Sequence, residues 1–176
     1  GRETAPDAAT SNRFLDADGA PLSYPQAVIS GLSVGVPGNI ALIAQAHAQS
    51  GQMNWASLFA PAIALARDGF AITPRLHAAL TSAKNRAALT PFGQALFYSA
   101  DGNPLPVGTL VRNAALAETL EAIAKEGPDA FYKGPLAADM AATIAAATPQ
   151  DGRMTVGDIT RYQAKERDAV CAPYRA

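Results

Sequence analysis

Few residues of this sequence have a type and a setting that point to chemistry, and we single out Arg2. It stands beside Glu3 in the opening stretch GRETAPDAAT. A guanidinium presents a rigid fork of N–H donors, which can hold a carboxylate through two parallel hydrogen bonds. The residues alone leave a second interpretation open, in which Arg2 is a solvated surface charge worth about 0–1 kcal/mol in an ion pair.

The sequence patterns of other catalytic or binding sites are missing. Residues 31–39, GLSVGVPGN, are rich in glycine but lack the signatures of phosphate-binding and dinucleotide-binding loops. His47 and His77 belong to no metal-ligand motif. Gly1 is not the Thr, Ser or Cys that an N-terminal nucleophile requires. We therefore assign no catalytic residue, no metal site and no cofactor to this chain.

Composition and charge are typical of a globular domain. The chain has 176 residues and is 49% hydrophobic, which predicts a single domain over residues 1–176. Its 14 basic and 15 acidic residues give a net charge of −1, without the basic excess of nucleic-acid-binding domains. No apolar run approaches the roughly 18 residues of a membrane helix. The single cysteine, Cys171, excludes an internal disulfide, and we expect it to be buried.

The elements that must position Arg2 are predicted to be mainly helical. Apolar residues recur at helical spacing, and Asn or Thr residues stand where helices could begin, at Asn39, Asn54, Thr73, Asn113 and Thr155. Pro61 is expected to start a new helix after a short helical turn, because proline favours the first turn. The predicted helical segments are 40–50, 55–60, 61–68, 74–86, 114–126, 135–147 and 155–162. In the last of these, Asp158 stands where a capping-box acid is expected.

Short strands are predicted only around turns and near the end of the chain. Ala-Asp-Gly-x-Pro-Leu occurs at 17–22 and at 100–105, and Asp-Gly between apolar residues favours a tight hairpin. Residues 164–175 lack helical periodicity and are interpreted as a strand. The predicted fold class is therefore mainly α, with a few short strands or hairpins.

Nearly the whole chain resembles, in the right order, the large subunit of gamma-glutamyltranspeptidases. An Arg-Glu-x-Ala-Pro stretch opens the similarity, and a Gly-x-Pro-Gly segment leading into a helix follows it. The similar stretches are RETAPDAAT through FLDADG, GLSVGVPGNIALIAQAH, LFAPAIALARDGFAIT, GPDAFYKGPLAADM and GRMTVGDITRYQAKERDAVCAPYR.

The resemblance implies a fold, an activity and a role for Arg2. The implied fold is a helical lobe of the αββα N-terminal nucleophile hydrolases. In this family a precursor cleaves itself, and the freed threonine of the small subunit attacks a γ-glutamyl amide such as glutathione. The glutamyl group then passes to water or to an amino acid. Arg2 corresponds to the family's arginine that holds the α-carboxylate of the donor.

The resemblance also implies partners and a location. The partners are the small subunit, the remainder of the large subunit and a small γ-glutamyl substrate, and the location is periplasmic or secreted. The chain is then an internal segment of the large subunit, without the catalytic threonine, and is expected to be inactive alone.

Two alternatives remain open. The first is a cephalosporin-acylase-like amidohydrolase of the same superfamily, which would cut a different acyl amide. The second is a helical interaction module without catalytic function. Such a module predicts self-similarity at a fixed period, and the sequence shows none.

Overall fold

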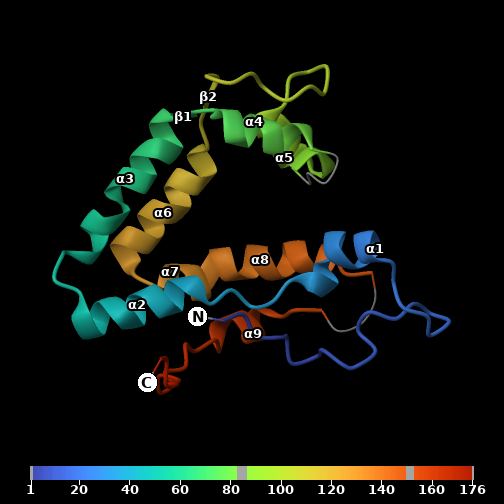
Figure 1. Cartoon of the computed structure of the whole chain (residues 1–176), viewed down its shortest axis with the longest axis vertical. Helices are drawn as coiled ribbons and strands as arrows, with labels where there is room; N and C mark the ends of the chain where they lie inside the picture. Colours follow the sequence, from blue (N-terminus) through green and yellow to red (C-terminus); the bar gives the residue numbers. More distant parts are fainter. Residues whose placement is uncertain (1, 83–86, 150–152, 176) are drawn as a thin grey trace. The chain divides into compact units, whose positions relative to one another are not determined.

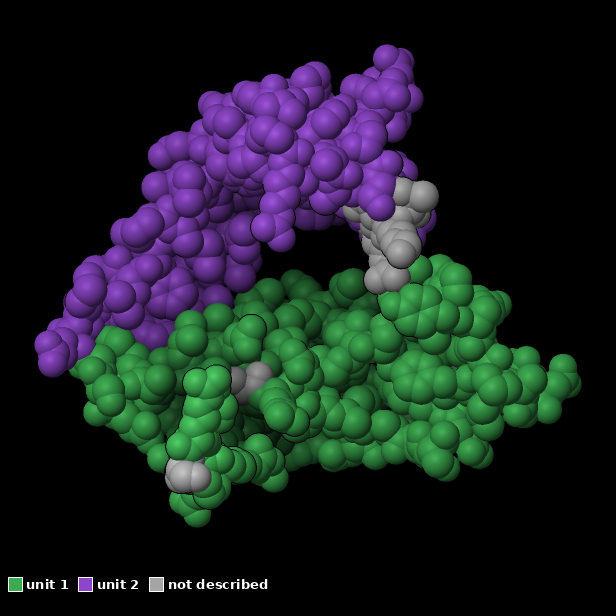
Figure 2. All heavy atoms as spheres, viewed as in Figure 1, with its two compact units in different colours: residues 1–51, 128–176 green, residues 52–127 purple. Residues whose placement is uncertain are grey.

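The chain folds mostly into α-helices, which confirms the predicted class (Figure 1). The computed structural model describes residues 2–82, 87–149 and 153–175. The chain divides into two compact units, which Figure 2 shows in different colours. Unit 1 contains Gly1–Gly51 and Pro128–Ala176, and unit 2 contains Gln52–Gly127. The single domain predicted over residues 1–176 stays a prediction.

Unit 1 is built from helices on both of its chain segments. They are α1 (Tyr24–Ile29), the 3₁₀ turn η1 (Gly31–Ser33), α2 (Asn39–Ser50), α7 (Asp129–Tyr132), α8 (Gly134–Ala146) and α9 (Val156–Thr160). Helix α8 packs against α7 and α9. The buried core side chains are Val36, Tyr132, Ala137, Ala141, Met154 and Ile159. Residues from the start and the end of the chain therefore share one core.

Unit 2 contains a helix pair and a smaller cluster beside a short antiparallel ladder. Its elements are α3 (Trp55–Asp68), β1 (Phe70–Ala71), α4 (Pro74–Thr81), η2 (Ala87–Leu89), α5 (Pro91–Phe97), β2 (Leu110–Val111) and α6 (Ala114–Glu126). Helices α3 and α6 lie side by side (Figure 1). The indole N–H of Trp55 donates to the carbonyl of Ile123 at 2.9 Å, and Arg67 pairs with Glu121.

Several helix starts are the predicted ones. The side chains of Asn54, Thr73 and Asn113 accept hydrogen bonds from main-chain N–H groups at the starts of α3, α4 and α6. Thr155 and Asp158 form the predicted capping box of α9. Each cap satisfies a donor that the helix cannot pair internally.

Two predicted boundaries are wrong, and a third lies outside the described residues. Helix α3 runs unbroken through Pro61, because its packing along α6 outweighs the one main-chain hydrogen bond that proline removes. The N-cap of α2 is Gly38 rather than Asn39. Helix α4 ends at Thr81, and the predicted end at Arg86 lies outside the described residues.

Both Asp-Gly turns are confirmed as tight hairpins. Gly19 and Gly102 have φ angles of +80° and +77°, a region that other residues adopt at a cost. Single antiparallel bridges close the two turns, Leu15 to Pro21 and Tyr98 to Pro104.

The end of the chain differs from its prediction. Residues 162–175 have no regular secondary structure, so the predicted strand is not formed. Cys171 is exposed rather than buried, because it lies in the exposed stretch of residues 165–175, outside the core. Among the described residues, no helix is both long and apolar enough to cross a membrane.

Candidate functional site

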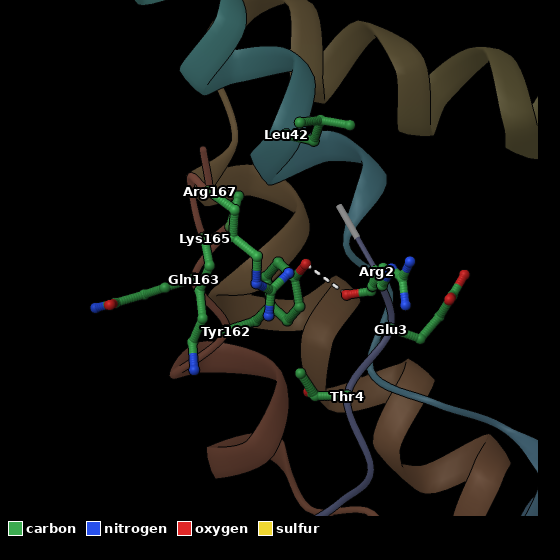
Figure 3. Close-up of a pocket in the computed structure, with 9 residues that line it drawn as sticks. Arg2, Glu3, Thr4, Leu42, Tyr162, Gln163, Lys165 and Arg167 are labelled. Carbon is green, nitrogen blue, oxygen red and sulfur yellow. Dashed lines mark hydrogen bonds between the residues drawn. The ribbon is translucent and has the colours of Figure 1, made fainter. Parts of the chain in front are cut away.

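Arg2 lies on the wall of an open pocket of about 340 Å³ in unit 1 (Figure 3). The walls come from the first residues of the chain, from helix α2 and from the segment after α9. The lining residues are Arg2, Glu3, Thr4, Leu42, Tyr162, Gln163, Ala164, Lys165 and Arg167. The structure thus brings the one predicted site residue together with residues that lie about 160 positions away in the sequence.

The pocket carries an excess of positive charge. Arg2, Lys165 and Arg167 line it, and Glu3 is the only acidic residue among the nine lining residues. A concave surface lined with cations attracts anions such as carboxylates. The hydrogen bond drawn between these residues in Figure 3 links the hydroxyl of Tyr162 to the main chain of Arg2. The arrangement is suited to binding an anion rather than to attacking a bond.

The main chain around Arg2 is fixed by contacts with distant parts of unit 1. The hydroxyl of Tyr162 donates to the Arg2 carbonyl oxygen at 2.7 Å. Two residues further on, the Thr4 carbonyl accepts from the N–H of Val36 at 2.8 Å, and these two residues form an antiparallel bridge. The backbone that carries the guanidinium is therefore held at the Arg2 carbonyl and, two residues later, at Thr4.

The buried carboxylate of Asp158 holds the same N-terminal segment further along the chain, at Asp7. Asp158, whose side chain is 3% exposed, accepts from the Asp7 N–H at 2.9 Å. It also accepts from the N–H and hydroxyl of Thr155, each at 2.7 Å, and Arg161 lies 3.5 Å away. Burial alone would raise the pKa of Asp158, but these donors and the Arg161 charge outweigh burial, so its pKa lies below the usual value.

We expect Asp158→Asn to lower the free energy of unfolding at about pH 7 by about 1–3 kcal/mol, because part-buried donors lose a charged acceptor. The pKa of Asp158 is lower in the folded than in the unfolded state. Its contribution is therefore present above the unfolded pKa and is lost as pH falls through the folded pKa. Urea denaturation should show a wild-type advantage that shrinks as pH falls below about 4.

The matched control is Asp129→Asn, since Asp129 is exposed and forms an exposed ion pair with Lys133, four residues later. We expect that variant to change the free energy of unfolding by less than about 0.5 kcal/mol. Equal losses for the two variants, or a pH-independent effect at Asp158, would contradict the prediction.

Two stacked tyrosines connect the pocket to the core. The rings of Tyr132 and Tyr162 lie 5.8 Å apart at an angle of 10°. The hydroxyl of Tyr132 donates to the Pro37 carbonyl at 2.8 Å and accepts from the Ala41 N–H at 3.1 Å. Burial raises the pKa of Tyr132 despite the lowering effect of the Ala41 N–H, so its hydroxyl keeps the proton that it donates.

Sequence reasoning missed most of this site. Tyr162, Lys165 and Arg167 carry no local motif, and only the fold places them beside Arg2. Gly1 lies outside the described residues. The described residues contain no cluster of three or more His, Cys, Asp or Glu side chains able to hold a metal ion.

Comparison with known proteins gives consistent matches along the whole chain. The family model described as gamma-glutamyltranspeptidase matches residues 1–176. Glutathione hydrolase 3 of Arabidopsis thaliana is 36% identical over 169 residues, which cover 96% of this chain and 25% of that protein. The glutathione hydrolase proenzyme of Escherichia coli K12 is 34% identical over 174 residues, which cover 99% of this chain and 29% of that protein.

Solved structures agree with these matches. The crystal structure of Helicobacter pylori gamma-glutamyltranspeptidase superposes with a TM-score of 0.84 at 31% identity, covering 99% of this chain and 49% of that chain. Cephalosporin acylase from Bacillus halodurans superposes with a TM-score of 0.70 at 27% identity, covering 82% of this chain and 27% of that chain. The predicted helical lobe of this hydrolase fold is confirmed. The chain spans between a quarter and half of the length of the proteins described here.

Proposed function

Because this chain belongs to the gamma-glutamyltranspeptidase family, we propose that it is part of an enzyme that cleaves γ-glutamyl amides such as glutathione. The enzyme transfers the glutamyl group to water or to an amino acid, and Arg2 binds the α-carboxylate of the donor. The threonine nucleophile comes from a small subunit, so the chain alone is inactive. A periplasmic or secreted location belongs to the same proposal.

The observation that carries the proposal is the setting of Arg2. It lies in a pocket with two further cations, on a main chain held at its own carbonyl and at Thr4. Among the described residues no hydrogen bond or ion pair engages the Arg2 guanidinium, so its donors are available to a ligand.

The chemistry of a γ-glutamyl donor matches this setting. The donor carries an α-carboxylate at one end and the scissile amide at the other. A bidentate pair between Arg2 and the carboxylate restrains the glutamyl group at its far end. The amide carbonyl is thereby presented to a nucleophile in a defined position, which lowers the entropic part of the barrier. Lys165 and Arg167 add to the positive potential that attracts the donor.

Substrate analogues test the proposal in the full-length, self-processed enzyme. We expect γ-glutamyl p-nitroanilide to be cleaved, and 4-aminobutyryl p-nitroanilide, which lacks only the α-carboxylate, to have a kcat/KM lower by about 100-fold or more. Glutaryl p-nitroanilide, which keeps that carboxylate but lacks the α-amine, is the matched control for Arg2. Equal cleavage with and without the α-carboxylate would contradict the role of Arg2, and no cleavage of any γ-glutamyl amide would contradict the activity.

A cephalosporin-acylase-like amidohydrolase is the second candidate. It is favoured by the superposition on the Bacillus halodurans cephalosporin acylase. The higher coverage of the H. pylori structure and the identities to glutathione hydrolases support the first candidate instead. Poor activity on γ-glutamyl amides together with efficient cleavage of acyl amides without an α-carboxylate would favour the acylase.

A further inference from the structure

We propose that Tyr162 is a positioning residue for Arg2, acting through the hydrogen bond from its hydroxyl to the Arg2 carbonyl oxygen. This inference rests on the proposed function, because it assumes that Arg2 binds the donor carboxylate. Tyr162 follows α9, and the contact joins residues 160 positions apart at a distance of 2.7 Å. Figure 3 shows the hydroxyl directed at the main chain of Arg2.

The direction in which the Arg2 side chain points depends on the position of its backbone. Among the described residues no hydrogen bond or ion pair orients the guanidinium, and Arg2 itself is exposed. A bidentate pair with a carboxylate requires a defined direction of approach. The fixed points closest to the side chain are therefore the Arg2 carbonyl, held by Tyr162, and the bridge at Thr4.

Contacts with the core of unit 1 hold the Tyr162 side chain in place. Its ring stacks on Tyr132, and the hydroxyl of Tyr132 bonds to the main chain on both sides of Gly38, at Pro37 and Ala41. Tyr132 is 5% exposed and belongs to the core of unit 1. A contact made by Tyr162 is therefore backed by packing and does not depend on a freely rotating surface ring.

The space around Gly38 provides a second observation on the same contact. A Cβ atom at this position would lie 2.2 Å from the Tyr162 hydroxyl oxygen and 2.9 Å from the Arg2 carbonyl oxygen. Its φ of −114° is accessible to other residues, so the backbone conformation does not require glycine. The space is what requires it, because the hydroxyl and the carbonyl meet where a side chain would otherwise lie.

The primary test is Tyr162→Phe in the full-length, self-processed enzyme. We expect KM for γ-glutamyl p-nitroanilide to rise about three- to tenfold, the fold-change that corresponds to one hydrogen bond, while kcat changes by less than about twofold. Tyr98→Phe is the matched control. The Tyr98 hydroxyl also donates to a main-chain carbonyl, that of Leu80 at 3.0 Å in unit 2. Tyr98→Phe should lower Tm by about as much as Tyr162→Phe does, and it should leave KM for γ-glutamyl p-nitroanilide unchanged.

Two further readouts separate positioning from general structural support. In an Arg2→Ala background, adding Tyr162→Phe should cause no further rise in KM, because the group that it positions is gone. For 4-aminobutyryl p-nitroanilide, which offers no α-carboxylate, Tyr162→Phe should leave kcat/KM unchanged. Gly38→Ala should raise KM for the γ-glutamyl donor as Tyr162→Phe does, since it displaces the same contact.

The failures of the two proposals differ. If Arg2→Ala leaves KM unchanged, the proposed function of Arg2 is overturned and the positioning inference with it. If Arg2→Ala raises KM but Tyr162→Phe does not, only the positioning inference is overturned. The positioning inference is also overturned if Tyr162→Phe raises KM just as much in the Arg2→Ala background. The same holds if Tyr162→Phe impairs the cleavage of donors with and without the α-carboxylate equally.

Discussion

Replacing Arg2 with alanine should raise KM for γ-glutamyl donors by about 100-fold or more, because two charge-assisted hydrogen bonds to the donor carboxylate are lost. Arg2→Lys keeps the charge but loses the planar fork, so we expect an intermediate rise of about tenfold. Steady-state kinetics of the full-length enzyme would measure both changes. The melting temperature should hardly move, since the side chain is exposed and makes no hydrogen bond or ion pair among the described residues.

Arg75→Ala is the matched control for this experiment. Arg75 is an exposed arginine in the first turn of α4 and lies outside the pocket. Its removal changes the net charge by the same amount and should leave KM unchanged. If Arg2→Ala and Arg75→Ala have the same KM, the proposed binding role of Arg2 is contradicted, and Arg2 is an ordinary surface charge.

The second large effect is expected at the centre of unit 1. Ile159 is 0% exposed and packs in the core that also contains Tyr132 and Met154. Ile159→Ala should lower the free energy of unfolding by about 2–5 kcal/mol, through lost burial and the cavity left behind. Urea denaturation followed by circular dichroism would measure this loss.

Ile29→Ala provides the comparison, because Ile29 is 58% exposed at the end of α1 in the same unit. We expect it to lower the free energy of unfolding by less than about 1 kcal/mol. Ile159 lies next to Asp158 and shortly before Tyr162, so its variant should also loosen the anchors of the Arg2 segment. Equal destabilisation by the two substitutions would contradict the description of this core.

The sequence predicts the helices of this protein better than it predicts their faces. Local signals such as the caps at Asn113 and Thr73 are carried by neighbouring residues and are confirmed. In α6, however, Leu116 is 45% exposed while the neighbouring Ala117 is buried. Periodicity indicates that a helix has an apolar face, but the partner helix decides which residues of that face are covered.

The candidate site is less predictable for the same reason. The role of Arg2 in holding a donor carboxylate follows from the sequence only through a family resemblance, because one arginine has no pattern of its own. The sequence predicts the local capping role of Asp158, but the hydrogen bond that this residue accepts from the Asp7 N–H spans 151 positions. Tyr162 lies in the same predicted helical segment, 155–162. No local sequence signal indicates that its hydroxyl contacts Arg2. Such contacts follow from tertiary packing, which no short motif records.

The order of segments in unit 1 has a consequence for biosynthesis. The segment carrying Arg2 leaves the ribosome before Tyr162, which follows 160 residues later. At the usual rates of translation this delay is roughly 8–30 s. Residues 52–127 are contiguous and are synthesised in full during that interval, so unit 2 can fold before unit 1 is complete. Until then the Arg2 segment lacks its contact with Tyr162, and the arginine acquires its full setting only near the close of synthesis of these residues.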